Sequence, residues 1–273
     1  MINSEKIGVG IITKDRSSLL EKLLVSLEPC INAGIVDHVI VVNDGDKLPD
    51  SIELGFDVTF TTNTQNLGVG KCKNIALRYL QEHEVDHFFL IEDDIFIKHP
   101  DVFEKYIEAA RVTGIQHFNF SQHGVMNKTF DGKSNPDPRK VVDYGTVKIG
   151  LYPHCVGAFS YYSKLCLDTA GLLDEEYFNA CEHVDHTYGI IKAGLHPSFW
   201  YFADIDESWE YLGDEPWSIQ TSTISSNVNH KEIMKAADAI FVKKHDCYPF
   251  EIPSVNISEV GAILKDLVSK YRR

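Results

Sequence analysis

The chain has 273 residues, of which 44% are hydrophobic, so it can bury a substantial core in one domain or in two tightly fused halves. Its 26 basic and 40 acidic residues give a formal net charge of -14, which opposes broad contact with nucleic acid or anionic lipid. We therefore expect no nucleic acid partner. A divalent cation can neutralise a diphosphate locally, so the acidic balance is compatible with a metal-assisted phosphate site.

The six cysteines are scattered without a CxxC pair, which is typical of reduced thiols in a cytosolic protein. The N-terminal residues lack the basic and apolar segments of a secretion signal. No apolar run reaches the roughly 18 residues of a membrane-spanning helix. We expect a cytoplasmic protein without a transmembrane segment.

Strands and helices are predicted to alternate along the first 120 residues. Short apolar runs, the first of them rich in β-branched residues, predict buried strands over residues 7–13, 39–42, 58–62 and 87–91. Helical spacing of apolar residues follows the first, third and fourth runs, over 19–27, over 75–80 and from about 101. Because parallel strands need helical crossovers, this alternation favours a doubly wound α/β domain.

The second half of the chain is less regular. Turn residues at 131–132, 135–138 and 145 indicate an excursion or flap, followed by a strand-like run at 156–162 and a helix-like run at 165–170. A further helix is expected from Glu182 to about Lys192. The tail 258–273 is amphipathic, so we expect a docking helix and, as the second interpretation, a peripheral membrane contact.

Three consecutive carboxylates, Glu92, Asp93 and Asp94, follow the apolar run 87–91 directly. They would repel one another without a cation to share, and a divalent ion resolves that repulsion. In an extended chain Glu92 and Asp94 point to one side and Asp93 to the other. An isolated acidic triplet is more often a solvated turn, but open α/β sheets bind ligands at the carboxyl ends of their strands. The position therefore predicts a metal site.

Four sequence blocks resemble those of the GT-A glycosyltransferases, and among them the family 2 type. They are GVGIITKDR at 8–16, VVNDGD at 41–46, NLGVGKCKN at 66–74 and EDD at 92–94. All four occur in family order, and a weaker similarity runs from Gly157 to Gly194. The resemblance implies a single GT-A domain with a mostly parallel sheet flanked by helices. Its nucleotide-sugar-binding half would span 1–120, a fused acceptor-binding half 121–220 and a C-terminal helical extension 221–273.

The resemblance also implies a reaction. The donor would be a nucleotide-sugar, with a UDP-sugar preferred, and the cofactor would be Mn²⁺ or Mg²⁺. The sugar would pass with inversion to a hydroxyl of a saccharide or glycolipid acceptor, in polysaccharide or glycoconjugate synthesis. The alternative is a catalytically degenerate GT-A protein with a sugar-nucleotide-binding or structural role, because the chain departs from the family pattern at Glu92 and His183.

The resemblance also implies which residues would form the donor site, when the family's roles are assigned to the matching positions of each block. Thr13 and Arg16 would line the nucleoside pocket, Asp44 would bond the uracil ring, and Gly68 and Lys71 would lie near the base or the diphosphate. From the residues alone, Asp44 in an Asn-Asp-Gly sequence is equally well explained as a turn residue, and a lone lysine is normally solvated surface.

For the metal, the resemblance implies Asp94 as ligand, with Asp93 near the ribose or assisting the ion. Glu92 stands where the family more often has Asp. Some relatives add a late histidine, for which His154, His230 and His245 are candidates, and we take His230 as the third ligand with Asp94 and Glu92.

Inverting transfer needs a base on the acceptor hydroxyl. The segment Glu182-His183-Val184-Asp185 resembles the family's Glu-Asp motif, with His183 in the place of Asp. We rank Asp185 and Glu182 equally, with His183 behind them. A non-catalytic explanation is that both carboxylates stabilise the helix N-terminus electrostatically. A separate metal site on the pairs His183 and His186 or Glu182 and Asp185 is weaker, because no clear third and fourth ligand is evident.

Three other interpretations are weaker still. Aromatic residues could form an acceptor platform, although core packing is commoner for each: Trp200, Tyr201, Trp209, Tyr211 and Trp217. A nucleotidyltransferase would need a Gly-rich, Arg-containing loop after residues 7–13, and a Rossmann dehydrogenase would need GxGxxG there. The chain has neither motif at that place.

Overall fold

The computed structural model describes residues 5–45, 48, 54–123, 138–215 and 227–273. Its first half contains β1 (Ile7–Thr13), α1 (Ser17–Asn32), β2 (His38–Asn43), β3 (Thr59–Thr62), α2 (Val69–Glu82), β4 (His87–Glu92), β5 (Ile95–Ile97), α3 (Val102–Thr113) and β6 (His117–Asn119). Its second half contains β7 (Lys140–Asp143), β8 (Lys148–Tyr152), β9 (Phe159–Ser163), α4 (Lys164–Ala170), α5 (Glu182–Lys192), β10 (Phe202–Ile205), β11 (Leu212–Asp214), α6 (His230–His245) and α7 (Ile257–Tyr271). Short 3₁₀ turns lie at Ser208–Glu210 and Pro249–Glu251. The predicted turn residues 131–132 and 135–137, and Trp217, lie outside the described residues.

A six-stranded sheet in the order β3-β2-β1-β4-β9-β6 forms the centre of the molecule. The pairs β2–β3, β1–β2 and β1–β4 are parallel, whereas β9 runs antiparallel to both β4 and β6. The strands β1, β2 and β4 are almost entirely buried because helices cover both sides of the sheet. The predicted α/β fold with a mostly parallel sheet is therefore confirmed.

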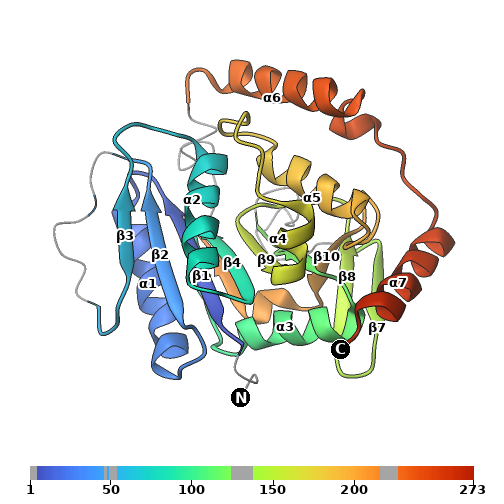
Figure 1. Ribbon diagram of the computed structural model, residues 1–273, viewed down its shortest axis with the longest axis horizontal. Coiled ribbons are helices and arrows are strands. Elements are labelled where there is room, and N and C mark those ends of the chain that lie inside the picture. The colour runs from blue at the N-terminus through green and yellow to red at the C-terminus, as the bar shows by residue number, and fades with distance from the viewer. Residues whose placement is uncertain (1–4, 46–47, 49–53, 124–137, 216–226) are drawn as a thin grey trace.

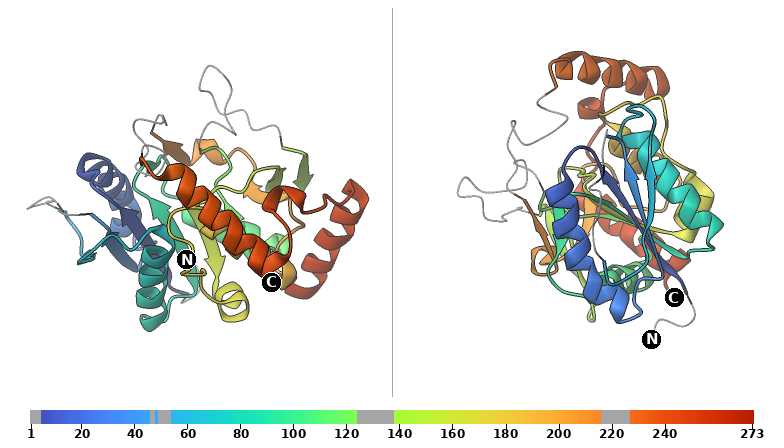
Figure 2. Two further views of the ribbon diagram at one scale, coloured as in Figure 1. Left: turned by 90° about the horizontal axis from the view of Figure 1, so that it is seen from above. Right: turned by 90° about the vertical axis from the view of Figure 1, so that its left-hand side faces the viewer.

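The helices cover the two faces of this sheet with two separate apolar clusters. Side chains of α1, α3 and α7 pack on one face and side chains of α2, α4 and α5 on the other, and Figure 2 shows α1 and α2 on opposite sides of the strands. The expected C-terminal docking helix is observed as α7, which buries Val260, Leu264 and Leu267 against the α1–α3 cluster.

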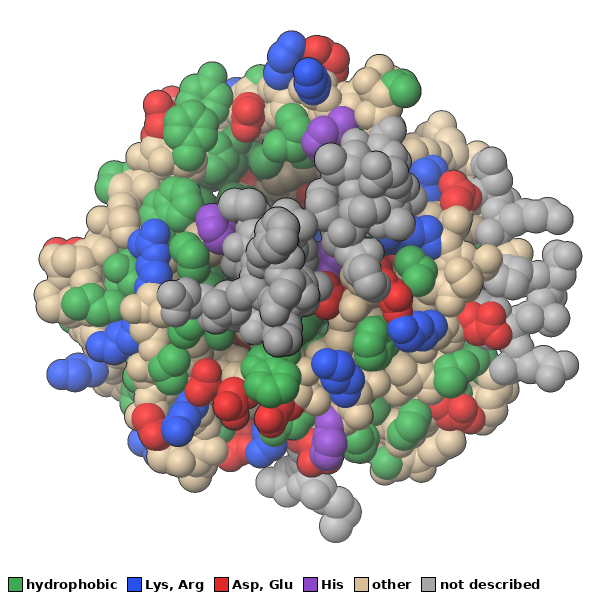
Figure 3. Space-filling view, turned by 180° about the vertical axis from the view of Figure 1, so that it is seen from behind, with side chains coloured by type: hydrophobic (Ala, Val, Ile, Leu, Met, Phe, Trp, Pro, Cys, Tyr) green, Lys and Arg blue, Asp and Glu red, His purple; other side chains and the backbone are tan. Residues whose placement is uncertain are grey.

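The second half adds elements that sequence periodicity did not predict. A three-stranded sheet has the order β10-β8-β7, and β11 pairs with β5. The helix α6 lies across the outside of the molecule near α5 (Figure 1) and buries only Ala237 and Phe241. Within the described part of the chain, no helix combines the length and the apolar character needed to cross a membrane. On the face shown in Figure 3, acidic and basic side chains are interspersed.

Candidate active site

The carboxyl ends of β1, β2 and β4 meet at one edge of the sheet, since the three strands are parallel neighbours. The cleft at this edge is lined by Thr13 at the end of β1, Asp44 after β2 and Glu92 at the end of β4. Arg16, which directly precedes α1, and Asn179 also line it. The structure thus brings four of the predicted donor-site residues together from three separate sequence blocks.

Asp93 and Asp94 both face Arg16. The Thr13 hydroxyl donates to Asp93 Oδ2 at 2.6 Å, Arg16 Nη1 donates to Asp94 Oδ2 at 3.0 Å, and Arg16 also forms an ion pair with Asp93. The expectation that Asp93 would point away from Asp94 is wrong, because β4 ends at Glu92 and the chain turns at the next two residues. Glu92 separates from them and turns toward Lys73.

Charged side chains of the protein offset part of the charge of the acidic triplet. Burial raises the pKa of Asp93 to about 7, although Arg16 and the Thr13 hydroxyl work in the opposite direction. Burial also disfavours the charged form of Glu92, but the neighbouring Lys73 ammonium outweighs it and keeps the pKa of Glu92 below its usual value. Arg16 and Lys73 thus offset part of the repulsion, and the role of a divalent ion stays a prediction.

Asp94 is the residue of the triplet that fits a metal ion. Its Oδ1 is buried and has no hydrogen-bond donor among the described residues, whereas its Oδ2 is paired with Arg16. One carboxylate is enough for an ion that also binds substrate phosphates and water. His230 is the first residue of α6, and its Nδ1 is buried without a partner in the described ranges. Those ranges contain no group of three or more His, Cys, Asp or Glu side chains arranged around a common ion.

Asp44 holds the loop that leads into α2. Its Oδ1 accepts hydrogen bonds from Asn63 Nδ2 at 2.8 Å and the Leu67 N–H at 2.7 Å, and its Oδ2 accepts from the Gly68 N–H at 2.8 Å. Asp44 is therefore a loop-organising residue, and the Cys72 thiol also hydrogen-bonds its carboxylate.

Gly68 is required where that loop joins α2. It has φ +85°, and a Cβ atom built on it would lie 2.0 Å from the Phe178 carbonyl oxygen. Only glycine adopts this conformation at low cost and allows the segment that precedes α5 to approach so closely.

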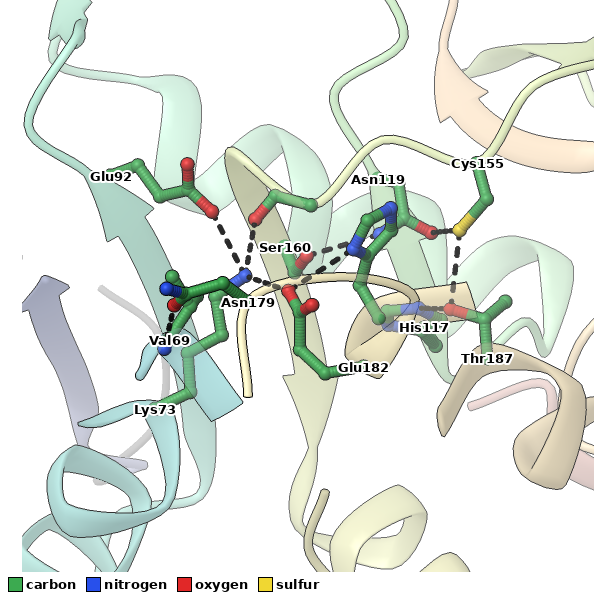
Figure 4. Close-up of polar contacts among 12 residues, drawn as sticks. Val69, Lys73, Glu92, His117, Asn119, Cys155, Ser160, Asn179, Glu182 and Thr187 are labelled. Atoms are coloured by element: carbon green, nitrogen blue, oxygen red, sulfur yellow. Dashed lines mark hydrogen bonds and ion pairs between the residues drawn. The ribbon is translucent and has the colours of Figure 1, made fainter. Parts of the chain in front are cut away.

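Lys73 is a site residue that sequence reasoning missed. Its Nζ donates to Glu92 Oε1 at 2.9 Å, to Glu182 Oε1 at 3.2 Å and to the Gly157 carbonyl at 3.0 Å (Figure 4). The predicted Lys71 lies in the first turn of the same helix, and its charge contributes to the lowered pKa of Glu175. A signal was available, because Lys73 precedes the buried Leu77 by four residues and thus lies on the apolar face of α2.

The three candidate bases at the start of α5 have different surroundings. Glu182 accepts from Lys73 and from His183 Nδ1, the latter at 3.1 Å. Asp185 accepts from Lys244 Nζ and His245 Nε2, both at 2.7 Å, so it joins α5 to α6.

The alternative metal site on this helix does not form. His186 Nε2 donates to the Gly171 carbonyl at 2.9 Å, so the imidazole is directed at α4 and its C-terminal turn. His186 therefore does not share a ligand position with His183.

Two of the five aromatic residues anchor the chain that leads to α7. Trp200 Nε1 donates to the Ile252 carbonyl at 2.7 Å, and the Tyr201 hydroxyl donates to the Val255 carbonyl at 3.1 Å. This agrees with the core-packing interpretation for these two residues. Trp209 is more exposed, at 42%.

Comparison with known proteins gives the same architecture. No family model matches the chain. An uncharacterized glycosyltransferase of Acanthamoeba polyphaga mimivirus is 25% identical over 232 residues, which cover 80% of this chain and 85% of that protein. TarS of S. aureus aligns with a TM-score of 0.53 at 15% identity, over 98% of this chain but only 44% of TarS. The mannosyltransferase PcManGT of Pyrobaculum calidifontis, in complex with GDP-Man and Mn²⁺, gives 0.51 at 12% identity, over 95% of this chain and 69% of that one.

This chain has the GT-A fold. The resemblance inferred from the four sequence blocks is thereby confirmed at the level of the fold. Within the GT-A fold, Thr13, Arg16 and Asp93 form one cluster with Asp94, and Asp44 and Gly68 form a second at the same edge.

Other predicted residues lie apart from these two clusters. Glu92 belongs with Lys73 and Glu182, and Lys71 makes no ion pair in the described part of the chain. Of the late histidines, His245 is bonded to Asp185, and no contact joins His230 to Asp94 within the described residues.

Proposed function

We propose that this chain is a glycosyltransferase that moves a sugar from a UDP-sugar to a hydroxyl of a saccharide or glycolipid acceptor. The reaction would invert the anomeric carbon and serve polysaccharide or glycoconjugate synthesis in the cytoplasm. The observation that carries the proposal is the cleft at the carboxyl ends of β1, β2 and β4, where Thr13, Arg16, Asp44 and Glu92 meet. The mimivirus relative is named as a glycosyltransferase, and TarS has been solved with UDP and with UDP-GlcNAc.

Asp44 would recognise the nucleobase of the donor. Three protein N–H groups already bind its carboxylate and fix its orientation, so it needs no reorganisation to accept one more donor. The imide N–H of uracil is such a donor, and a charged acceptor strengthens the bond. Guanine and thymine also carry a ring N–H, so the proposal of uracil must be tested against both.

The diphosphate would lie beside Arg16 and Asp94. Arg16 offers a guanidinium whose Nε is buried without a hydrogen-bond partner among the described residues. A Mn²⁺ or Mg²⁺ ion held by Asp94 Oδ1 would neutralise charge that develops on the departing diphosphate. Asp93, bonded to Thr13 and Arg16, keeps the guanidinium in place. His230 stays a proposed third ligand, and Glu92, held by Lys73, acts as a partner of that lysine.

A binding protein that retained the fold and lost catalysis is the second candidate. The pairing of Arg16 with both Asp93 and Asp94 favours it, because a cation of the protein already lies beside the two carboxylates that a metal ion would use. The two candidates share donor binding and differ in turnover.

Calorimetric titration with UDP, GDP and dTDP, each with Mn²⁺ and with a chelator, tests the donor site. We expect Mn²⁺-dependent binding of UDP in preference to the other two, and its loss in Asp44→Asn. Asp168→Asn, which changes an exposed carboxylate of α4 in the same way, is the matched control. If no nucleotide binds, or if Asp44→Asn binds UDP like the control, the donor-site assignment is wrong.

A further inference from the structure

We infer that His183 is the general base of the transfer reaction and that Glu182 orients it. This inference rests on the proposed function, and it reverses the ranking that the sequence favours, in which Asp185 and Glu182 precede His183. It follows from which atoms of the three side chains are already committed to other contacts.

Asp185 is committed to α6. Its side chain is 3% exposed, and both of its oxygens accept from cationic or polar groups: Lys244 on Oδ2, His245 and Tyr177 on Oδ1. Lys192 Nζ donates to His245 Nδ1 at 2.8 Å, which leaves the proton on Nε2 pointing at Asp185. Asp185 could reach an acceptor hydroxyl only by breaking these bonds, so its role is to dock α6 on α5.

Glu182 is buried and holds two donors through one of its oxygens. Its side chain is 5% exposed, and Oε1 accepts from Lys73 Nζ at 3.2 Å and His183 Nδ1 at 3.1 Å. Although burial opposes ionisation, Lys73 and His183 keep the pKa of Glu182 well below its ordinary value. A carboxylate held so firmly in the charged form is a weak proton acceptor.

His183 has one committed nitrogen and one open nitrogen. Nδ1 donates to Glu182, and within the described residues Nε2 has no hydrogen-bond partner and the side chain is 24% exposed. The ring is seated on Gly157, where an added Cβ would lie 2.8 Å from His183 Cγ. The bond to Glu182 selects the tautomer with the proton on Nδ1 and leaves the lone pair on Nε2, which is the arrangement a histidine base requires.

A chain of contacts joins His183 to the donor cleft. Glu92 lines that cleft, Lys73 bonds Glu92 on one side and Glu182 on the other, and the Gly157 carbonyl accepts from the same ammonium. The base therefore stands beside the donor site and outside it, on the side of α5. The proposal requires the acceptor hydroxyl to reach the sugar from this side, opposite the departing diphosphate.

The acceptor oxygen forms a bond to the anomeric carbon while its proton passes to His183 Nε2. The bond from that carbon to the phosphate oxygen breaks, and its electron pair leaves with the nucleoside diphosphate. The charged groups facing the imidazole are Glu182 of α5 and, behind it, Lys73 of α2 and Glu92 of β4. Glu182 stabilises the imidazolium that forms, whereas the N-terminus of α5 and Lys73 oppose it.

The test measures UDP release from UDP-Glc, UDP-Gal and UDP-GlcNAc in Mn²⁺, with water as the acceptor, beside calorimetric UDP binding. We expect His183→Asn to bind UDP like the natural chain and to lose ~10²–10⁴-fold in kcat. His183→Asp should recover activity, with the acid limb of its pH profile moved to lower pH, and imidazole should restore turnover to His183→Ala. Asp185→Asn should keep kcat within a few-fold of the natural chain.

Two outcomes overturn the inference alone. In the first, His183→Asn binds UDP and turns over normally; in the second, Asp185→Asn loses as much kcat as His183→Asn while its UDP affinity is unchanged. A natural chain that neither binds UDP nor releases it from any donor overturns the proposed function, and this inference with it. The nitrogen shifts of His183, assigned by difference from His183→Asn, give a readout without turnover. They should report a proton on Nδ1, and a proton on Nε2 instead would contradict the proposed geometry.

Discussion

Lys73→Met removes the cation that lies between two carboxylates, and its cost can be worked out from the structure. The Lys73 side chain is 3% exposed, that of Glu182 5% and that of Glu92 22%. Burial opposes the charge on Lys73, but Glu92 and Glu182 outweigh it and raise its pKa, so the lysine stays charged. Methionine keeps most of the volume and removes the ammonium.

The cost arises mainly at Glu182. Breaking a buried ion pair by removing one partner destabilises a protein by about 3–5 kcal/mol. Glu92 is the more exposed of the two carboxylates and can regain water, so we expect a loss of about 3–4 kcal/mol in the free energy of unfolding. The loss should be partly reversed in Lys73→Met/Glu182→Gln, which no longer leaves a buried charge.

Urea denaturation at pH 7 is the assay, and Lys71→Met is the matched control. It makes the same substitution two residues earlier in α2, at a half-buried lysine without an ion pair in the described chain. We expect it to cost no more than about 0.5 kcal/mol. If the two lysine variants unfold at the same urea concentration, the bridging role of Lys73 is refuted.

Three further predictions concern other parts of the site and the core. Gly68→Ala should cost about 1–3 kcal/mol more than Gly34→Ala, which has a similar φ but open space around it, and should weaken UDP binding in calorimetry; equal costs would refute the close approach. Asp185→Asn should speed hydrogen exchange in α6 without altering UDP affinity, and unchanged exchange would refute the docking role. Burial lowers the pKa of His196 from 6.5 to about 4, so the folded protein keeps this imidazole neutral. The unfolded chain takes up a proton there below pH 6.5, so stability is complete above pH 6.5 and falls as the pH drops toward 4. By pH 5 this group alone should lower the free energy of unfolding by about 2 kcal/mol, and a flat profile from pH 7 to 5 in urea titrations would contradict the assignment.

The fold could be predicted because its signals are local. The apolar runs of β1, β2 and β4 are buried on both faces, so they stand out from the amphipathic helices between them. The helix α6 gave little signal because it buries only Ala237 and Phe241 over 16 residues. The exposed strand β7 likewise lacks an apolar pattern.

The site could be predicted only in part, because its decisive contacts join distant residues. The residue types of the donor cleft follow from the four blocks, and the structure brings those blocks to one sheet edge. That Asp185 is already bound depends on Lys244 and His245, which lie 59 and 60 residues further along the chain. The direction of Asp93 depends on a turn that the extended-chain assumption did not include.

The most direct test of a UDP-sugar transferase is the release of UDP from UDP-sugars. The natural chain and Asp94→Asn should be compared with UDP-Glc, UDP-Gal and UDP-GlcNAc in Mn²⁺ and in chelator. The account predicts Mn²⁺-dependent UDP release by the natural chain with at least one donor, and little release by Asp94→Asn, because the free Oδ1 of Asp94 is the proposed metal ligand. Release that is equal in both proteins, or absent with every donor while UDP still binds, would contradict it.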